Sequence, residues 1–286
     1  MKTIAFLGIG AMGDRIAHNL LKVGYDLRIW NRSPQKCQNL VEKGAISYSS
    51  PQEAVKGADV AIAMVTNDEA SRFIWLDEVN GAIHNLKPDT VAMEYSTLTP
   101  DWCRELATQV KHKGGNFLDA PVVGTRPQAE KRQLIHLIGG EETVVSQVRE
   151  LLKASSKAIY QVGTVGSGMT MKLAVNALFG TQVAALSEIL GLLRSAGIET
   201  KSAVKLLNEM PITSSSLRVI SSLITGQNYA PLFPIDLVEK DFSYVEQLAN
   251  SVNASIPAMN RIREIYQQGK KAGYGGDNIT GIAQLF

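Results

Sequence analysis

Short apolar and β-branched runs alternate with amphipathic stretches through the first half of the chain. Such alternation is typical of βαβ units, which build a parallel sheet with helices on its faces. Several helical stretches begin with proline in the first turn, where its missing N–H group costs nothing. The predicted strands are TIAFLG, DLRIW, DVAIAMV, TVAMEYS, NFLDAPV, LIHLIGG and KAIYQVG. The predicted helices between them lie near residues 11–23, 34–43, 51–57, 100–113 and 141–153.

The strand pattern stops after about Gly163, and the rest of the chain shows helical patterns separated by glycine or proline. The helices predicted there span residues 167–196, 199–209, 214–224, 235–251 and 256–272. We therefore predict an α/β fold: a Rossmann-type doubly wound parallel sheet over residues 1–163, followed by an all-α domain over residues 164–286. The second domain should begin with a long interdomain helix. The uncharged run 173–187 within it is short of a membrane span, so we expect a buried helix.

Composition narrows the class of protein. The 286 residues are 45% hydrophobic and 20% charged, which suits a soluble globular chain large enough for two domains. The 29 basic and 27 acidic residues are scattered, so nucleic acid is not an expected partner. Cys37, Cys103 and the four histidines lack metal-ligand spacing, and we predict neither a metal site nor a disulfide. A reducing cytoplasm fits this cysteine usage.

A glycine pattern follows the first predicted strand directly and opens the first predicted helix. In this position GxGxxG permits a tight turn and brings backbone N–H groups close to a pyrophosphate. We therefore predict a dinucleotide-binding loop made of Gly8, Ile9, Gly10, Ala11, Met12 and Gly13.

The second predicted strand ends without the acid that an NAD-binding unit usually presents to the ribose 2′-hydroxyl. Asn31, Arg32 and Ser33 stand there instead, with Lys36 close behind. Two cations, a hydroxyl and a neutral donor suit a 2′-phosphate, so the pattern predicts NADP(H) in preference to NAD(H). In the alternative interpretation, Arg32 and Lys36 only solvate a surface loop.

One lysine, Lys172, lies in the apolar start of the long helix, with Asn176 one turn later. Both share a helix face with Gly168 and Gly180, which predicts a groove where a ligand presses against the glycines. Apolar surroundings should lower the pKa of the Lys172 ammonium toward values useful for proton transfer. In the alternative interpretation, Lys172 extends to the surface or pairs with a distant carboxylate, and Gly168 is a cap residue.

With these residues in place, the chain resembles the β-hydroxyacid dehydrogenase family. That family includes 3-hydroxyisobutyrate dehydrogenases, tartronate semialdehyde reductases and glyoxylate/succinic semialdehyde reductases. The motifs that carry the likeness run nearly from end to end: FLGIGAMG, IWNRS, AMVTND, YSTLTP, DAPVVGTRPQAEKRQL, VGSGMTMKLAVN and FPIDLVEKDF. The stretch PQAEKRQL is most similar to the glyoxylate/succinic semialdehyde reductase branch.

The resemblance implies roles for individual residues. Lys172 matches the family's proton donor, and Asn176 matches the amide that holds the lysine and the substrate. The further residues implied for the cofactor are Val65, Thr66, Asn67, Thr97 and Lys240. Those implied for the substrate are Ser96, Val123, Gly124, Thr125, Phe233 and Asp241. From the residues alone, Ser96 and Thr97 could equally be turn and cap residues, and Lys240–Asp241 an exposed charge pair.

One position departs from the family pattern. Family members carry a serine for the substrate carboxylate where this chain has Val123, whose side chain cannot donate a hydrogen bond. The N–H groups of Gly124 and Thr125, and the Thr125 hydroxyl, could hold a carboxylate instead.

Together these observations predict an NADPH-dependent oxidoreductase. We expect hydride transfer to the carbonyl of a small aldehyde or oxo acid, or the reverse oxidation of a 3-hydroxy acid, with Lys172 as general acid/base in a cleft between the domains. Imine reduction on an uncharged substrate, which Val123 would suit, is one alternative. A non-catalytic NADP-binding protein is another. No membrane partner is expected, and the resemblance implies a homo-oligomer, either dimer or tetramer.

Overall fold

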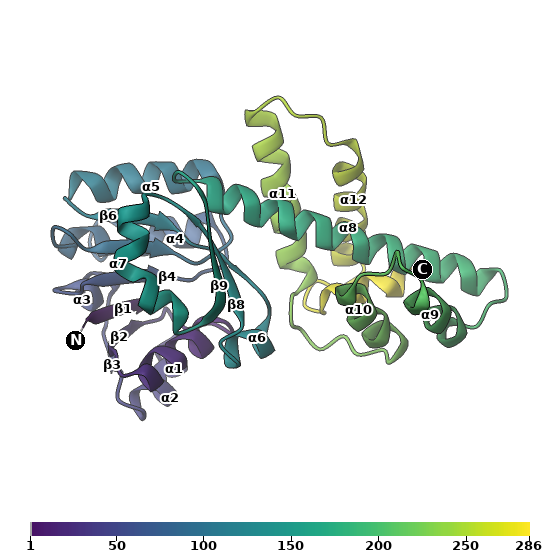
Figure 1. The fold of residues 1–286 in the computed structure, drawn as a ribbon, viewed down its shortest axis with the longest axis horizontal. Coiled ribbons are helices and arrows are strands. Elements are labelled where there is room, and N and C mark those ends of the chain that lie inside the picture. Colours follow the sequence, from purple (N-terminus) through teal and green to yellow (C-terminus); the bar gives the residue numbers. More distant parts are fainter. Residues whose placement is uncertain (1) are drawn as a thin grey trace. The chain divides into compact units, whose positions relative to one another are not determined.

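The computed structural model describes residues 2–286, and these form two compact units. The first unit, which ends at Lys172, is an α/β structure, and the second, Leu173–Phe286, is helical (Figure 1). This confirms the predicted fold class, a mostly parallel Rossmann-like sheet followed by an all-helical domain. The compact units divide within the long helix, whereas the predicted domain boundary precedes that helix.

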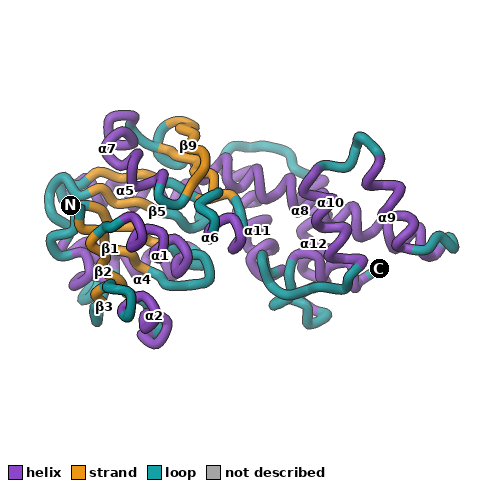
Figure 2. Tube along the Cα trace, turned by 60° about the horizontal axis from the view of Figure 1, so that its bottom comes forward, coloured by secondary structure: helices purple, strands orange, loops and turns teal. Residues whose placement is uncertain are grey.

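A single sheet forms the centre of the first unit (Figure 2). Its strands are β1 (Thr3–Leu7), β2 (Asp26–Trp30), β3 (Ile46–Ser47), β4 (Val60–Ala63), β5 (Val91–Glu94), β6 (Asn116–Asp119), β7 (Val122–Val123), β8 (Leu134–Gly139) and β9 (Ser156–Gly163). Their order is β3-β2-β1-β4-β5-β6-β8-β7, with β9 on β8. The order reverses direction between β1 and β4, which is the position where open α/β sheets bind ligands.

The sheet departs from parallel pairing at one edge. Strands β1 to β6 pair in parallel, but β8 runs antiparallel to both β6 and β7. A parallel return needs a crossover of about a dozen residues or more, usually a helix. The chain between β7 and β8 holds only the five-residue α6 (Arg126–Glu130), so β8 returns as the second arm of a hairpin.

Helices cover both faces of the sheet because alternate residues of each strand point to opposite sides. Ile4 and Phe6 of β1 belong to one core cluster, and Ala5 and Leu7 to the other. The helices of the first cluster are α1 (Gly13–Val23), α2 (Gln38–Val41), α6 and α7 (Glu142–Lys153). Those of the second are α3 (Pro51–Val55), α4 (Asp68–Leu76) and α5 (Pro100–His112).

Helix α4 is an addition that the hydrophobic pattern does not reveal. It begins after Asn67, whose Oδ1 accepts a hydrogen bond from the N–H of Ala70 at 2.9 Å. Asp68 and Glu69 occupy the first turn, where acidic side chains interact favourably with the helix dipole. This capping pattern, rather than periodicity, is the signal in the sequence that identifies α4.

The second unit packs its helices around a separate core. They are the continuation of α8 (Ser167–Ser195), α9 (Thr200–Glu209), α10 (Ser215–Thr225), α11 (Ile235–Ser251) and α12 (Pro257–Lys271). By length and composition α8 could cross a membrane, but half of its most apolar window is buried inside the molecule. Core helices of soluble proteins pass the same test.

Candidate active site

Each glycine of the loop between β1 and α1 meets a different requirement. Gly8 has φ +107°, and a Cβ there would lie 2.3 Å from the carbonyl oxygen of Met64. A Cβ on Gly13 would lie 2.2 Å from the carbonyl oxygen of Gly8. A Cβ on Gly10, in contrast, would meet no atom of residues 2–286 within 4 Å. Gly8 and Gly13 therefore pack the turn, and Gly10 leaves open the space that a dinucleotide pyrophosphate needs.

Asn31, at the end of β2, holds this loop. Its Oδ1 accepts a hydrogen bond from the N–H of Ile9 at 2.9 Å, and its Nδ2 donates to the carbonyl of Ser33 at 2.9 Å. The amide predicted as a phosphate donor is thus engaged in positioning the loop. Arg32 and Lys36 are exposed beside it, and Ser33 is half-buried.

The carboxyl ends of β4 and β5 bring three predicted residues together. The N–H of Val65 donates to Ser96 Oγ at 2.7 Å, and Ser96 Oγ donates to Glu94 at 2.5 Å. Ser96 is only 2% exposed and its side chain supports the loop; its contact with substrate stays a prediction. Thr97, the next residue, is half-buried. Asn67, further along the β4 loop, serves as the cap of α4.

Beyond β7, Thr125 has both predicted donors engaged. Its N–H and its hydroxyl each donate to Gln128 Oε1, at 3.0 and 2.6 Å. These bonds stabilise the start of α6. In this arrangement both Thr125 donors are occupied by Gln128, and Val123 beside it offers no side-chain donor.

The glycines of α8 have protein neighbours where a groove was expected. A Cβ on Gly168 would lie 2.5 Å from the carbonyl oxygen of Leu137, and one on Gly180 would lie 2.6 Å from Phe242 Cε2. The prediction of a groove along both glycines is wrong, because each lets another element pack closely against α8. Lys172 and Asn176, between them, are both buried, at 8% exposure.

Asn176, Lys240 and Asp241 meet within the second unit. Asn176 Nδ2 donates to Asp241 Oδ2 at 2.6 Å, and Lys240 Nζ lies 2.9 Å from Asp241 Oδ1. Lys240 also lies over the ring of Tyr244, 4.7 Å from its centre. The pair is not the exposed one of the alternative interpretation, since Asp241 is 3% exposed.

Phe233 precedes α11 in the second unit. Its side chain packs against the helical core, and its N–H donates to Asn278 Oδ1 at 3.0 Å.

Two buried acids were not predicted as functional. Glu94 ends β5 and Asp119 ends β6, and neither is exposed. Burial raises the pKa of each to about 7, although hydrogen bonds from neighbouring donors oppose that shift. The signal in the sequence was an acid as the last residue of an apolar strand. Within residues 2–286 no group of three or more His, Cys, Asp or Glu side chains could hold a metal ion.

Two family models together match nearly the whole chain. A family model described as the NAD binding domain of 6-phosphogluconate dehydrogenase matches residues 3–163. A second, described as NAD-binding of NADP-dependent 3-hydroxyisobutyrate dehydrogenase, matches residues 166–286. Glyoxylate/succinic semialdehyde reductase 2 of Arabidopsis thaliana is 30% identical over 99% of this chain and 78% of that protein.

A second curated protein and a solved structure are also similar to this chain over its full length. Cytokine-like nuclear factor N-PAC of Xenopus tropicalis is 28% identical over 100% of this chain, which spans 53% of that protein. The crystal structure of 3-hydroxyisobutyrate dehydrogenase from Salmonella typhimurium has a TM-score of 0.90 and 25% identity, covering 100% of both chains. Together with the two family models, these similarities show that the chain belongs to the 3-hydroxyisobutyrate dehydrogenase-like β-hydroxyacid dehydrogenase family of NAD(P)-dependent oxidoreductases, which act on CH–OH groups.

Proposed function

We propose that this protein is an NADPH-dependent reductase of small aldehydes or oxo acids of the semialdehyde and glyoxylate type. In reverse it oxidises the corresponding hydroxy acid. The observation that carries the proposal is the buried Lys172, one helical turn before an Asn176 whose amide is fixed by Asp241. A buried amine next to an oriented amide is suited to proton transfer.

The chain's own residues would divide the chemistry as follows. The glycine loop holds the dinucleotide, which supplies the hydride when bound. Lys172 donates a proton to the carbonyl oxygen as negative charge develops there, and takes it back in the oxidation. Asp241 accepts from Asn176 Nδ2, which orients the amide so that Oδ1 is the atom that holds the Lys172 ammonium. Asp241 is thus a positioning residue for Asn176.

Replacement of Lys172 tests this assignment. A positioned acid contributes about 10²- to 10⁴-fold to the rate, so Lys172→Ala should lower kcat by that order. The Kd for NADPH, measured by fluorescence titration, should stay unchanged because the lysine acts on the substrate. Lys157→Ala, at an exposed lysine of the same unit, is the control. Normal turnover in Lys172→Ala would refute the mechanism.

The substrate class is tested with a panel. NADPH oxidation is followed with glyoxylate, succinic semialdehyde, tartronate semialdehyde and a cyclic imine, and NADP⁺ reduction with 3-hydroxyisobutyrate. We expect turnover of the carboxylate-bearing carbonyls with a high KM, because Val123 and Thr125 offer the carboxylate no side-chain donor. Val123→Ser should lower that KM by about tenfold, the value of one hydrogen bond to a charged group.

Two other results of the substrate panel would favour the alternative functions, imine reduction or NADP binding without catalysis. Turnover of the imine alone would support imine reduction. NADPH binding without turnover of any member would support a non-catalytic NADP-binding protein.

We further propose that the cofactor is NADP(H) in preference to NAD(H). The support is the absence of an acid at the end of β2, together with exposed Arg32 and Lys36 and the Ser33 hydroxyl. Arg32→Asp should invert the ratio of kcat/KM for NADPH to that for NADH, since an acid there repels the 2′-phosphate and binds the 2′-hydroxyl. Lys22→Asp, on α1, is the matched charge reversal. A wild-type preference for NADH would contradict the proposal.

Finally, we propose a homo-oligomer that buries one face of α8. Met171, Leu178, Ile189 and Leu192 are exposed, and their spacing places them on one side of that helix. An exposed apolar stripe of this kind is typical of a subunit interface. Light scattering coupled to size exclusion should give a dimer or larger assembly, and Leu178→Glu with Leu192→Glu should dissociate it. A monomeric wild-type protein would contradict this.

A further inference from the structure

Glu94 and Asp119 lie side by side at the carboxyl edge of the sheet, and the mechanism above uses neither. They are register partners on the parallel strands β5 and β6. Both side chains point to the face that carries α4 and α5, because Ala92 and Phe117, two residues earlier on each strand, belong to that core cluster. Buried carboxylates are costly unless they accept several hydrogen bonds, so a neighbouring pair of them calls for an explanation.

We propose that Glu94 and Asp119 are positioning residues for the reaction: Glu94 fixes the loops after β4 and β5 against the cofactor, and Asp119 fixes the first turn of α8, which carries Lys172. The part of the proposal that concerns Glu94 requires only that the chain belongs to an NAD(P)-dependent family. The Asp119 half rests on the proposed role of Lys172.

Glu94 is the centre of a hydrogen-bond network with two sides. On one side its Oε1 accepts from the hydroxyl and the N–H of Ser96, at 2.5 and 3.3 Å. Ser96 Oγ in turn accepts from the N–H of Val65, so the carboxylate reaches the end of β4 through one hydroxyl. On the other side its Oε2 accepts from Ser71 Oγ at 2.7 Å and from Trp75 Nε1 at 3.0 Å, both on α4.

The two sides have different consequences. The bonds to Ser71 and Trp75 attach a helix to the sheet. The bonds through Ser96 hold the loop that begins with Val65, at the reversal of strand order where a dinucleotide binds. Loss of the Ser96 hydroxyl would leave the Val65 N–H without its acceptor and loosen that loop.

Asp119 caps the helix that carries Lys172. Its Oδ1 accepts from the N–H of Gly166 and its Oδ2 from the N–H of Met169, each at 2.8 Å. These are among the N–H groups that a helix start leaves without internal partners. Gly168 packs so closely that a Cβ would lie 2.9 Å from Asp119 Oδ2. Lys172 follows Gly168 by one turn, so this contact determines where the lysine lies relative to the ends of the strands.

Both sites require a group that only accepts hydrogen bonds. Glu94 faces four donors and Asp119 at least two, so an amide would place its NH₂ against another donor. The burial that raises the pKa of both acids to about 7 is the cost of this arrangement. A role in stability alone would produce the same contacts, and the experiment is designed to separate the two.

For Glu94 we compare two serine variants that each remove one bond to the same carboxylate. Both serines are buried and both variants should lower the midpoint of thermal unfolding. Ser96→Ala should also raise the Kd for NADPH, measured by fluorescence titration, by about 5- to 10-fold. Ser71→Ala should leave that Kd within about twofold of wild type, because the bonds of Ser71 join only α4, α5 and the sheet. Equal Kd values in both variants, raised or unchanged, would overturn this half.

For Asp119 the variant is Asp119→Asn, and Glu199→Ala, at the exposed N-cap of α9, is the control. Asp119→Asn should lower kcat with glyoxylate by about tenfold or more through misplacement of Lys172, with the Kd for NADPH unchanged. It should also raise the rate at which a small acylating reagent modifies Lys172, relative to Lys157, by about threefold as the first turn loosens. Glu199→Ala should change neither. If Asp119→Asn does not fold, Gly168→Ala displaces the same turn and should give the same kcat loss.

Failure of this half is distinguishable from failure of the proposed function. Unchanged kcat and acylation in Asp119→Asn, with turnover lost in Lys172→Ala, would overturn the positioning role alone. Full turnover in Lys172→Ala would refute the catalytic lysine and with it the Asp119 half, while the NADPH titrations still decide the Glu94 half.

Discussion

Several polar side chains of the first unit already form hydrogen bonds within the protein in the absence of a ligand. Asn31 spans the glycine loop and the end of β2, Ser96 joins β4 to β5, and Thr125 begins α6. Each supplies a polar group that a sequence pattern would assign to ligand binding. In this structure each instead fixes a backbone segment, and a rigid loop loses less conformational entropy when it binds.

At the residue scale, the burial of His136 predicts how the stability of the protein depends on pH. It is buried, with Nδ1 3.1 Å from the Ala120 carbonyl oxygen and its ring 4.7 Å from that of Tyr95. Burial lowers the pKa of His136 from 6.5 to about 4. The neutral ring therefore contributes stability that is present above pH 6.5 and lost as the pH falls toward 4. The stability advantage of wild type over His136→Gln should shrink by about 2 kcal/mol between pH 7 and pH 5 in urea unfolding.

The comparison of wild type with His136→Gln separates the pH dependence due to His136 from that due to the buried acids Glu94 and Asp119. The raised pKa values of Glu94 and Asp119 give stability that is full below about pH 4 and lost as the pH rises through about 7, the opposite trend. Both acids remain in the variant, so their contribution cancels in the difference. An advantage that does not change with pH would show that folding does not lower the pKa of His136.

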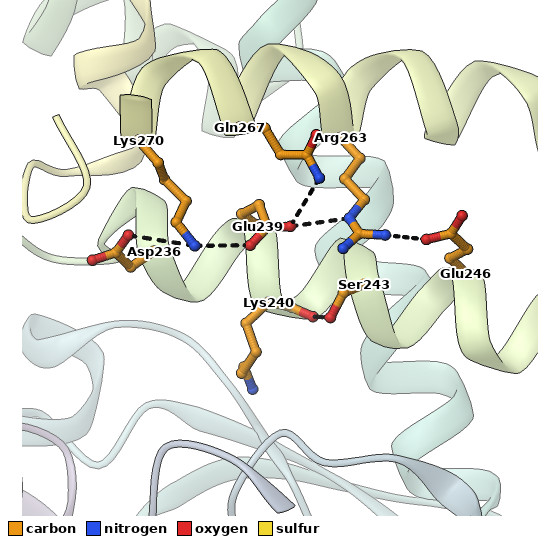
Figure 3. A network of polar contacts seen from close by, with 8 residues as sticks. All are labelled: Asp236, Glu239, Lys240, Ser243, Glu246, Arg263, Gln267 and Lys270. Carbon is orange, nitrogen blue, oxygen red and sulfur yellow. Dashed lines mark hydrogen bonds and ion pairs between the residues drawn. The ribbon is translucent and has the colours of Figure 1, made fainter. Parts of the chain in front are cut away.

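At the scale of elements, an ion-pair network joins α11 to α12 (Figure 3). Glu239 Oε1 accepts from Arg263 Nε at 3.0 Å and Oε2 from Lys270 Nζ at 2.9 Å, and Arg263 also pairs with Glu246. Burial alone would raise the pKa of the Glu239 carboxyl, but bonds from Lys270 and Arg263 lower it overall. Lys240, the next residue, leaves α11 on the side away from this network.

Replacement of Glu239 should therefore destabilise the helical unit without touching Lys240. Glu239→Gln leaves two cations without their buried partner and should cost about 1–3 kcal/mol in urea unfolding monitored by circular dichroism. Glu264→Gln, which breaks the exposed pair with Arg261 on the same helix, should change the midpoint little. Equal losses in the two variants would show that burial of Glu239 adds nothing.

At the scale of the whole molecule, the distribution of tryptophan offers a separate signal for one unit. Trp30, Trp75 and Trp102 are the only tryptophans, and all are buried in the first unit. NADP⁺ at about 100 times its Kd should stabilise the unit that binds it by about 2.7 kcal/mol. The midpoint of thermal unfolding followed by tryptophan fluorescence should then rise by about 5–10 °C. Measured NADP⁺ binding without a rise in that midpoint would place the site outside the first unit.

The features that depend on neighbours along the chain could be predicted from the amino-acid sequence. The glycine loop, the missing acid after β2, the change from strand to helix patterns and the spacing of Lys172 and Asn176 can all be identified locally. They follow from backbone conformation and from periods of two and 3.6 residues, which do not require the rest of the fold.

Hydrogen bonds between groups far apart in the sequence, in contrast, depend on the folded arrangement of strands and helices. Asp119 accepts hydrogen bonds from Gly166 and Met169, and Asn176 donates to Asp241. Val65, after β4, donates to Ser96, after the neighbouring strand β5. The direction of β8 and the close packing at Gly168 and Gly180 also depend on how the elements are connected. A single sequence states which donors and acceptors exist, but strand register and helix packing determine which of them lie within 3 Å of each other.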